Sequence, residues 1–375
     1  MDIPKGLLDD QFTLGVEEEF QIVHAETREL RSYVSRLLEE GRSNALLRER
    51  VRPEMHQSVV ETGTGICRDI KEARAEVSEL RQSLGDLAKK GGMRIVAAGT
   101  HPFSDWKTQE ITDGDRYKVI VEDLQDVARA NLIFGLHVHV GLKDREVAMA
   151  MANQVRYFLP HILALSTSSP FWLGRHSGLK SLRSEIFKRF PRTGIPSAFD
   201  SYGAFQRYVD LLVKTHCIDN AKKIWWDVRA HPFFDTVEIR ICDMTTRVDD
   251  TMAIVALIQA VMGKLYLLYR RNWAFREYSR ELIEENKWRA VRYGIGGKLI
   301  DFGKQEEVPT AEIIAELLDF VSEAADIFKS HDELDRIRYI LKEGTSADKQ
   351  IAVFNETKDM KAVVDHLIHQ TSLGL

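Results

Sequence analysis

The chain has 375 residues, of which 44% are hydrophobic and 29% are charged, and its formal net charge is −5. These values exclude a disordered chain and a basic surface for nucleic acid or anionic membrane. We find no linker, no repeat and no apolar run of about 18 residues, so we expect one domain over 1–375 without a membrane partner. Three widely spaced cysteines without a metal or redox motif favour a reduced, cytoplasmic protein.

The first part of the sequence mixes strands with amphipathic helices. Residues 13–23, TLGVEEEFQIV, predict a strand, and residues 69–90 predict a helix that ends at a Gly-Gly pair. Shorter strands are expected at SVVETGTG, RIVAAGT and GLHVHVG. Residues 115–130 predict a helix, and a further helix from about Asp144 meets Pro160, where we expect a kink or a break.

The second part begins with an irregular segment. Residues 171–201 are rich in Gly, Pro, Ser and Arg, and they predict a long functional loop. IWWDVR and TVEIRIC then predict a hairpin or two neighbouring strands, and residues from about 249 to 375 are mostly helical, with one interruption at GGKLIDFG. The order of elements predicts an α+β fold with a largely antiparallel sheet, one face covered by helices and the other open.

Three of the predicted strands each carry two polar side chains on one face. Successive side chains of a strand point to opposite faces, so residues two apart share a face. The polar pairs are Glu17 and Glu19, His137 and His139, and Glu238 and Arg240. A solvated sheet face would explain any one strand, but the three together favour a binding face. Glu18 falls on the apolar face, where we expect it at a rim or paired with a basic residue on the helix side.

Carboxylates and imidazoles on one face suit a hard divalent cation. Mg²⁺ and Mn²⁺ prefer oxygen ligands, and Mn²⁺ accepts a histidine readily. Glu54 and Glu61 could complete a second site, but they would lie on opposite strand faces unless a bulge or bend intervenes, so the residues alone support this pair weakly. His56 or His101 would give an alternative ligand set, whereas zinc-type spacing is absent.

Arginines are expected to complement the acidic face. Arg229 and Arg240 would flank it, and the long loop adds Arg183, Lys188, Arg189 and Arg192. Guanidinium groups bind phosphate and carboxylate in a bidentate manner, although neutralisation of nearby glutamates explains Lys188 and Arg189 more simply. P-loop, dinucleotide-binding and nucleophile-elbow motifs are absent. Metals on carboxylates with arginines opposite suit phosphoryl transfer from a nucleotide held without a P-loop.

Five ordered motifs carry a resemblance to a known family: FTLGVEEEF, GLHVHVG, FPRTG, WWDVRAHP and DTVEIRICD. From about residue 11 into the C-terminal helices, the sequence resembles the bacterial carboxylate–amine ligases of the type 2 glutamate–cysteine ligase family. The resemblance implies a glutamine synthetase-like fold. Such a fold has a curved, mainly antiparallel sheet with helices on its convex face, nucleotide and metals on its concave face, and here a helical C-terminal region.

The resemblance also implies roles for individual residues. Metal ligands would be Glu17, Glu19, Glu54, Glu61, His137 and Glu238. The nucleotide would be bound by His139, Arg183, Arg229 and Arg240, and the chemical step would involve Arg240, Arg229 and Glu61. One departure is Asp235, which stands where relatives often have glycine, and it leaves the choice of amine open.

The implied reaction is an ATP-dependent ligation with Mg²⁺, or alternatively Mn²⁺. ATP would phosphorylate a carboxylate, expected to be the γ-carboxylate of glutamate, and an amine such as cysteine would displace phosphate. The same fold would also serve a ligase for another amine or carboxylate, a non-catalytic ATP- or metal-binding protein or, more remotely, a guanidino kinase. Trp225, Trp226, Phe233 and Phe234 could line an acceptor pocket, although aromatic pairs on strands more often belong to the core. Family grounds weakly favour a homodimer.

Overall fold

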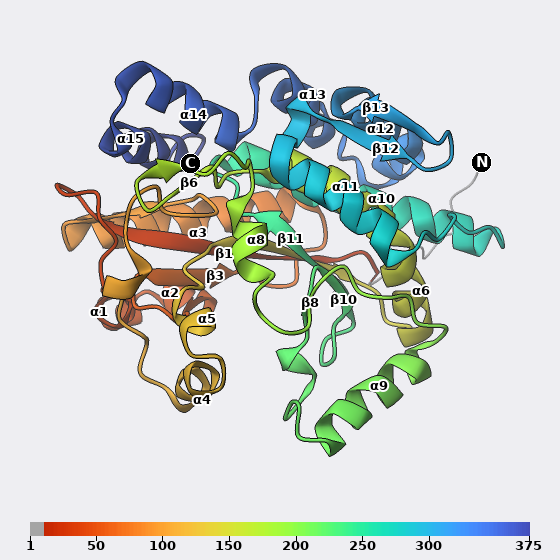
Figure 1. Cartoon of the computed structure of the whole chain (residues 1–375), viewed down its shortest axis with the longest axis horizontal. Helices are drawn as coiled ribbons and strands as arrows, with labels where there is room; N and C mark the ends of the chain where they lie inside the picture. Colours follow the sequence, from red (N-terminus) through yellow and green to blue (C-terminus); the bar gives the residue numbers. More distant parts are fainter. Residues whose placement is uncertain (1–10) are drawn as a thin grey trace.

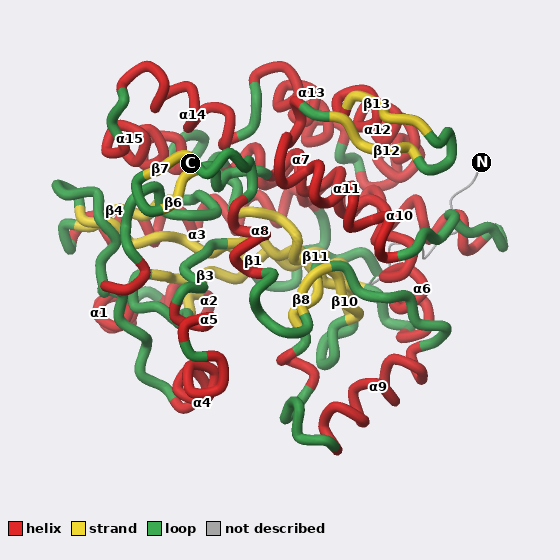
Figure 2. Tube along the Cα trace, viewed as in Figure 1, coloured by secondary structure: helices red, strands yellow, loops and turns green. Residues whose placement is uncertain are grey.

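An antiparallel sheet runs through the computed structural model, which describes residues 11–375 (Figures 1 and 2). Residues 1–10 of the expected domain lie outside the described residues. The strand order is β10-β11-β5-β1-β3-β2, and β4 pairs with β1 as the seventh strand. These strands are β1 (Leu14–His24), β2 (Val51–Pro53), β3 (Val59–Gly63), β4 (Met93–Val96), β5 (Gly135–Gly141), β10 (Val228–Ala230) and β11 (Thr236–Asp243).

Helices surround this sheet, and three short strand pairs connect them. The α-helices are α1 (Val34–Glu40), α2 (Ala45–Arg50), α3 (Ile70–Lys90), α4 (Asp115–Leu124), α5 (Asp126–Arg129), α6 (Arg145–Val155), α7 (Leu159–Ser166), α8 (Leu182–Phe187), α9 (Tyr202–Lys214), α10 (Val248–Arg270), α11 (Arg280–Tyr293), α12 (Thr310–Phe328), α13 (His331–Glu343), α14 (Ser346–Thr357) and α15 (Met360–Thr371). The 3₁₀ turns are η1 (Gly41–Ser43), η2 (Trp106–Thr108), η3 (Arg156–Phe158), η4 (Ala221–Lys223) and η5 (Gly294–Gly296). The short pairs join β6 (Phe171–Trp172) with β7 (Arg175–His176), β8 (Thr193–Gly194) with β9 (Trp225–Trp226), and β12 (Lys298–Asp301) with β13 (Glu306–Pro309).

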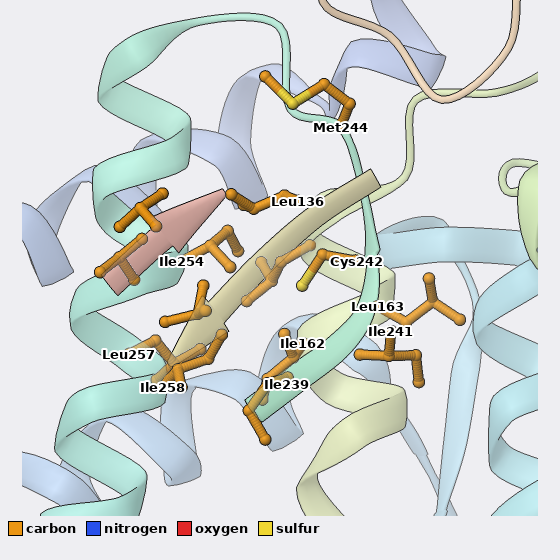
Figure 3. Close-up of a cluster of buried hydrophobic side chains, with 14 of the residues drawn as sticks. Leu136, Ile162, Leu163, Ile239, Ile241, Cys242, Met244, Ile254, Leu257 and Ile258 are labelled. Atoms are coloured by element: carbon orange, nitrogen blue, oxygen red, sulfur yellow. The ribbon is translucent and has the colours of Figure 1, made fainter. Parts of the chain in front are cut away.

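The main hydrophobic core lies between the apolar face of the sheet and the helices behind it. Leu136 of β5 and Ile239 of β11 pack with Ile254, Leu257 and Ile258 of α10, all of them fully buried (Figure 3). Burial of these aliphatic side chains removes a large apolar area from water, which fixes the orientation of each strand. Because side chains alternate along a strand, the polar pairs of the same strands must face away from this core.

Helix α10 (Val248–Arg270) corrects the expectation that no apolar run reaches membrane-spanning length. The helix has 23 residues, and its most apolar 18-residue window has a mean hydropathy of 1.8, so by length and composition it could cross a membrane. The fold buries 89% of that window, however, and the core helix of a folded domain has the same composition. Contacts of α10 with α3, α7, α12, α13 and β5 account for its apolar character.

Several predicted elements form with changed boundaries. Asp69 caps α3 by accepting hydrogen bonds from the backbone of Lys71 and Glu72, which explains the start of the predicted 69–90 helix. The expected helix over 115–130 is split at Gln125, whose φ is +50°. The break near Pro160 falls at η3, just before α7, in whose first turn the proline is tolerated. The expected 171–201 loop contains α8, and GGKLIDFG forms part of the β12–β13 hairpin.

Candidate active site

A cavity of about 560 Å³ lies over the polar face of the sheet. Its walls come mainly from β1, β3, β5, β10 and β11, from the connection between β2 and β3, and from α4 and α8. Every site residue expected from the sequence lines it: Glu17, Glu19, Glu54, Glu61, His137, His139, Arg183, Arg229, Glu238 and Arg240. Segments far apart in the sequence therefore meet at one polar cavity.

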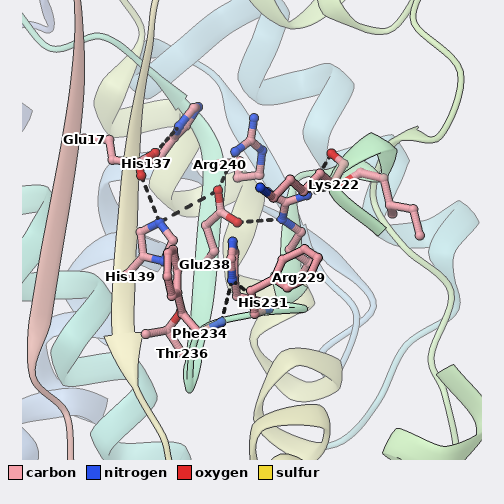
Figure 4. Close-up of polar contacts among 12 residues, drawn as sticks. Glu17, His137, His139, Lys222, Arg229, His231, Phe234, Thr236, Glu238 and Arg240 are labelled. Carbon is pink, nitrogen blue, oxygen red and sulfur yellow. Dashed lines mark hydrogen bonds and ion pairs between the residues drawn. The ribbon is translucent and has the colours of Figure 1, made fainter. Parts of the chain in front are cut away.

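The first group of candidate metal ligands comes from three neighbouring strands. Glu17 of β1 is paired in register with His137 of β5, and Glu238 of β11 lies opposite His139 of β5. The Nδ1 atom of His137 lies 3.1 Å from Oε2 of Glu17 (Figure 4). One donor atom from each of Glu17, His137 and Glu238 lies within 4.8 Å of the others. These three residues are named the strand cluster.

The second group consists of Glu19, Glu54 and Glu61, and we name it the carboxylate cluster. Glu19 of β1 is paired in register with Glu61 of β3, so their side chains share a face. Glu54 follows the end of β2, and the chain turns before β3 begins. Because the chain turns between them, Glu54 and Glu61 lie on the same side of the sheet, although their spacing along a continuous strand would put them on opposite faces. One oxygen from each of the three carboxylates lies within 4.8 Å of the others.

The carboxylate cluster is electrostatically unfavourable by itself. Burial and the charges of neighbouring glutamates raise the pKa of Glu61 well above its usual value. Burial and the charge of Glu54 raise the pKa of Glu19 to about 7, and burial also raises the pKa of Glu54. Within residues 11–375 none of these three carboxylates forms an ion pair. Three partly exposed carboxylates that have no ion-pair partner among the described residues fit a hard divalent cation.

The strand cluster is held in a different charge state. Although burial opposes the charged form of Glu238, the adjacent Arg240 and Arg229 keep its pKa well below the usual value. The imidazoles of His137 and His139 likewise outweigh the burial of Glu17 and lower the pKa of that carboxyl. Burial, reinforced by Arg240, lowers the pKa of His137 to about 4. Ionised carboxylates and a neutral imidazole are the forms that bind a cation.

Three arginines bring positive charge to the same cavity. The Nε of Arg229 donates to Oε2 of Glu238 at 2.6 Å, and Arg240 donates to the other oxygen of Glu238. The Nε atoms of Arg240 and Arg183 are buried and have no hydrogen-bond partner among the described residues. A buried donor without a partner is costly, and both arginines line the cavity, so they are candidates for binding an anion there.

Known proteins resemble this chain over most of its length. The model of glutamate-cysteine ligase family 2 (GCS2) matches residues 13–366. The chain belongs to this family. A relative from Sorangium cellulosum, provisionally named glutamate–cysteine ligase 2, is 78% identical over 371 residues that cover 99% of each chain. A relative from Herpetosiphon aurantiacus with the same provisional name is 54% identical and covers 97% of this chain and 94% of its own.

Solved structures support the fold of this family member. A glutamate–cysteine ligase from Francisella tularensis in complex with AMP superposes with a TM-score of 0.69 at 13% identity, covering 97% of this chain and 89% of that chain. A bifunctional glutathione synthetase from Pasteurella multocida gives a TM-score of 0.59 at 16% identity, covering 98% of this chain and 53% of that chain. Both likenesses concern the fold, and the expected α+β architecture with a mainly antiparallel sheet is confirmed.

Several cavity residues were missed by sequence reasoning. They come from α4, from the segment before β5, from η4 and from the turn after β10: Arg116, Tyr117, Asn131, Lys222 and His231. Of the expected aromatic residues, Trp225, Phe233 and Phe234 line the cavity, whereas Trp226 stacks on Tyr208 outside it. The ring of His231 stacks on Phe234 with centroids 4.5 Å apart. Only the motif WWDVRAHP signalled part of this wall, because the other residues lie in segments without a polar strand pattern.

Other candidate residues lie elsewhere or serve the backbone. His101 is fully buried away from the cavity, and its Nε2 lies 2.8 Å from the backbone oxygen of Arg28, so it is not part of a metal site. His56 lines the cavity, but its Nε2 is engaged by the backbone oxygen of Arg129 at 2.9 Å. Arg192 donates to the backbone oxygen of Lys223 at 2.9 Å.

Three further charged residues also lie off the cavity wall. Lys188, Arg189 and Asp235 do not line it. Asp235 instead forms an ion pair of 2.9 Å with Arg145 of α6. An effect of Asp235 on the choice of amine stays a prediction.

Glu18 has a structural role. Its side chain is 1% exposed and receives hydrogen bonds from Arg81 of α3, whose Nε lies 3.0 Å from Oε2 of Glu18. Arg81 also donates to the backbone oxygen of Thr246 at 2.8 Å, and Thr251 donates to Glu18 at 3.2 Å. The expectation that Glu18 pairs with a basic residue on the helix side is confirmed.

Proposed function

We propose that this protein is an ATP-dependent ligase that joins the γ-carboxylate of glutamate to an amine such as cysteine. The observation that carries the proposal is the position of Arg240, which interacts electrostatically with carboxylates of both clusters in one cavity. Phosphoryl transfer requires positive charge around the transferring group and fixed positions for two anionic reactants. A cavity with two cation-binding clusters and a shared arginine meets this requirement.

Divalent cations would be held by residues of both clusters. The strand cluster offers Glu17, His137 and Glu238, and the carboxylate cluster offers Glu19, Glu54 and Glu61. These sets match the oxygen-rich preference of Mg²⁺ and also accommodate Mn²⁺. When bound, such a cation neutralises phosphate and carboxylate oxygens. In this assignment Glu61 contributes a ligand oxygen, and through it takes part in the chemical step.

The arginines would act on the transferring group directly. A carboxylate oxygen of glutamate attacks the γ-phosphorus of ATP, the bond to the β-phosphate oxygen breaks, and ADP leaves. The free Nε of Arg240 donates to the oxygens on which negative charge is spread in this step. Arg229 holds Glu238 ionised and in place, while His139 and Arg183 complete the anion-binding wall. The amine nitrogen then attacks the acyl carbon, phosphate leaves, and the nitrogen loses a proton.

The reaction is tested by measuring ADP release from Mg²⁺-ATP with L-glutamate, with and without cysteine and a panel of other amines. Product masses identify any amide. A γ-glutamyl-cysteine mass with stoichiometric ADP is the expected result. An amide formed only with another amine would keep the reaction and change the substrate. ATP binding without turnover across the whole panel would overturn the ligase proposal in favour of a binding protein on the same fold, and a phosphorylated guanidino product without amide would indicate a kinase.

We also infer the domain organisation and the cellular location of this protein. The mostly helical segment from about 249 to 375 would form one catalytic domain with the sheet, a view supported by Gln259 of α10, which donates to the backbone oxygen of Phe12 at 2.8 Å. A cytoplasmic location is supported by three free cysteines, Cys67, Cys217 and Cys242. A homodimer remains a prediction from the family resemblance.

A further inference from the structure

Asp243 closes the strand that carries Glu238 and Arg240, yet it lies outside the cavity wall. The register between β11 and β5 shifts between Ile239 and Cys242, and Asp243 is then paired with Gly135. A β-bulge of this kind redirects the side chains that follow it. The same Gly135 donates its backbone N–H to Glu19 of the carboxylate cluster. Asp243 is therefore anchored next to the candidate active site without being part of it.

The carboxylate of Asp243 is fully buried, and both of its oxygens accept hydrogen bonds from two segments, one at Ser168 and Ser169 and the other at Ser181. Its Oδ2 accepts from the backbone N–H of Ser168 at 2.9 Å and from the hydroxyl of Ser169 at 2.7 Å. Its Oδ1 accepts from the hydroxyl of Ser181 at 2.7 Å. Asp243 forms no ion pair with any described residue. A buried carboxylate that accepts three such bonds is a strong orienting group.

These bonds lead to Arg183, which lines the cavity and whose buried Nε has no hydrogen-bond partner among the described residues. The hydroxyl of Ser169 accepts a hydrogen bond of 3.0 Å from the backbone N–H of Arg183. Ser181, at the start of α8, also contacts the hydroxyl of Ser184 at 2.9 Å. The first turn of α8 is thus tied to Asp243 on both sides of Arg183.

The side chain of Arg183 is tied to the same strand. Its Nη1 and Nη2 atoms donate to the backbone oxygens of Ile241 and Arg240, each at 3.3 Å. A Cβ atom added at Gly135 would lie 2.4 Å from Nη2 of Arg183, and one added at Gly99 would lie 2.9 Å from Cγ of Asp243. A side chain at Gly135 or Gly99 would therefore force the Arg183 guanidinium or the Asp243 carboxylate to shift. Arg183 is thus joined to β11 directly through its guanidinium and indirectly through its backbone N–H, by way of Ser169 and Asp243.

We propose that Asp243 is a positioning residue that holds Arg183 in place for an anionic group of a substrate, through Ser169 and Ser181. The inference deepens the proposed function and rests on it, since Arg183 is assigned there to the anion-binding wall. Without the Asp243 acceptor, the first turn of α8 loses its fixed partner, and the Arg183 guanidinium no longer keeps its place beside the strand. A shift of about 1 Å in such a group is enough to weaken catalysis strongly.

The test is a double-mutant cycle between Asp243→Asn and Arg183→Met, followed by steady-state kinetics for ATP, glutamate and the amine. Asp243→Asn keeps the size of the side chain and removes its charge. We expect it to lower kcat/KM by about 10- to 100-fold, as substitutions of groups that orient a binding residue do. Asp243→Asn must raise the KM for the same substrate whose KM rises in Arg183→Met. The double variant must have a kcat/KM no lower than that of Arg183→Met alone.

A structural role alone gives a different pattern. Asp243→Asn would then lower the melting temperature, and its effect on kcat/KM would multiply with that of Arg183→Met, which would overturn the proposal. Ser169→Ala offers a milder change if Asp243→Asn fails to fold, because it removes only the hydroxyl between Asp243 and the Arg183 backbone. It must show the same selective rise in KM. The matched control is Asp250→Asn, another buried acid, which pairs with Arg336 at 2.8 Å away from the cavity and must leave all kinetic constants unchanged.

The same variants separate this inference from the proposed function. If the wild-type protein forms no amide, the ligase proposal fails, but calorimetric binding of Mg²⁺-ATP and of glutamate still measures the coupling between Asp243 and Arg183. A non-additive loss of affinity for one of these ligands would sustain the inference, and additive losses or unchanged affinities would overturn it.

Discussion

Glu18 and Glu19 are adjacent in β1, and the fold treats their charges in opposite ways. Glu18 points into the core and meets Arg81, which is itself fully buried. Glu19 points to the other face and meets Glu54 and Glu61, with no cation bonded to any of the three among the described residues. Of these two neighbours in β1, the carboxylate with an ion-pair partner in the chain is the structural one. The carboxylate without such a partner among the described residues is the candidate cation ligand.

The two environments differ in what they cost the folded protein. Arg81 directs its guanidinium to Glu18 and to backbone oxygens of Thr245 and Thr246, so both charges are satisfied without a ligand. The carboxylate cluster is satisfied only when a cation or protons are bound, as the raised pKa values of Glu19 and Glu61 indicate. Binding sites commonly store such unfavourable electrostatics. Stability and activity should therefore respond oppositely to substitutions on the two faces.

The largest effect is expected for Glu61→Gln. This change removes one charge from the carboxylate cluster and should lower the rate of ADP formation by about 10³-fold, since a ligand to a charge-neutralising cation is lost. The free energy of unfolding of the metal-free protein should stay the same or rise, because repulsion with Glu54 and Glu19 is relieved. Coupled-enzyme kinetics and urea denaturation without divalent metal measure the two quantities.

Glu26→Gln, in the exposed turn after β1, is the matched control and should change neither quantity. A folded Glu61→Gln protein with near wild-type turnover would remove Glu61 from the candidate site.

The second effect concerns stability alone. Glu18→Gln leaves the buried Arg81 without its carboxylate and should lower the free energy of unfolding by about 3–5 kcal/mol, as expected when one member of a buried ion pair is removed. Activity per folded molecule should remain within about threefold of wild type, since Glu18 is absent from the cavity wall. Urea denaturation and active-site-normalised kinetics test both statements.

Replacing the pair together, as Glu18→Leu with Arg81→Met, should recover most of this loss because no unpaired charge is buried. If Glu18→Gln abolished turnover at full stability, the division between the two faces of β1 would be wrong.

A third effect comes from divalent metal. Mg²⁺ at about 100 times its dissociation constant should stabilise the folded protein by about 2.7 kcal/mol per site through preferential binding. The rise in melting temperature should be reversed by a chelator and reduced in Glu61→Gln, but it should persist in Glu18→Gln. Scanning calorimetry with Mg²⁺, Mn²⁺ and Ca²⁺ gives the preference of the site. An equal response of wild type and Glu61→Gln would exclude the carboxylate cluster as a metal site.

Site residues could be predicted from the sequence where they lie on strands, because side chains alternate between the two faces of a strand with a period of two residues. The polar pairs on β1, β5 and β11 could be predicted because alternation along a strand is local, and the antiparallel registers bring them together. Glu54 and Glu61 were weak candidates on residues alone, since their convergence depends on a turn between β2 and β3. The family resemblance, and not periodicity, singled them out.

Other features depend on tertiary packing that no local pattern reveals. The partner of Glu18 is Arg81, which lies within a helix whose neighbouring residues read as an ordinary amphipathic face. The bulge in β11 turns Asp243 toward two serine-rich segments and could not be placed from the alternation of TVEIRIC. Residues such as Arg116 and Lys222 reach the cavity from peripheral helices and turns, where surface charge is common.

The smallest effect on stability and activity is expected for Asp235→Gly. Asp235 is an exposed carboxylate, unlike the buried Glu18 and the cavity-lining Glu19 of β1. Asp235 is exposed and pairs with Arg145, whose guanidinium also donates to the backbone oxygens of His231 and Phe234. A surface ion pair of this kind contributes at most about 1 kcal/mol, and the backbone bonds of Arg145 survive the substitution. We therefore expect a loss of stability below about 1 kcal/mol and an unchanged rank order of amines in the ligation assay. A changed amine preference would show that the turn carrying His231 and Phe234 reads the acceptor, and that an exposed acid can select substrate without a place in the cavity wall.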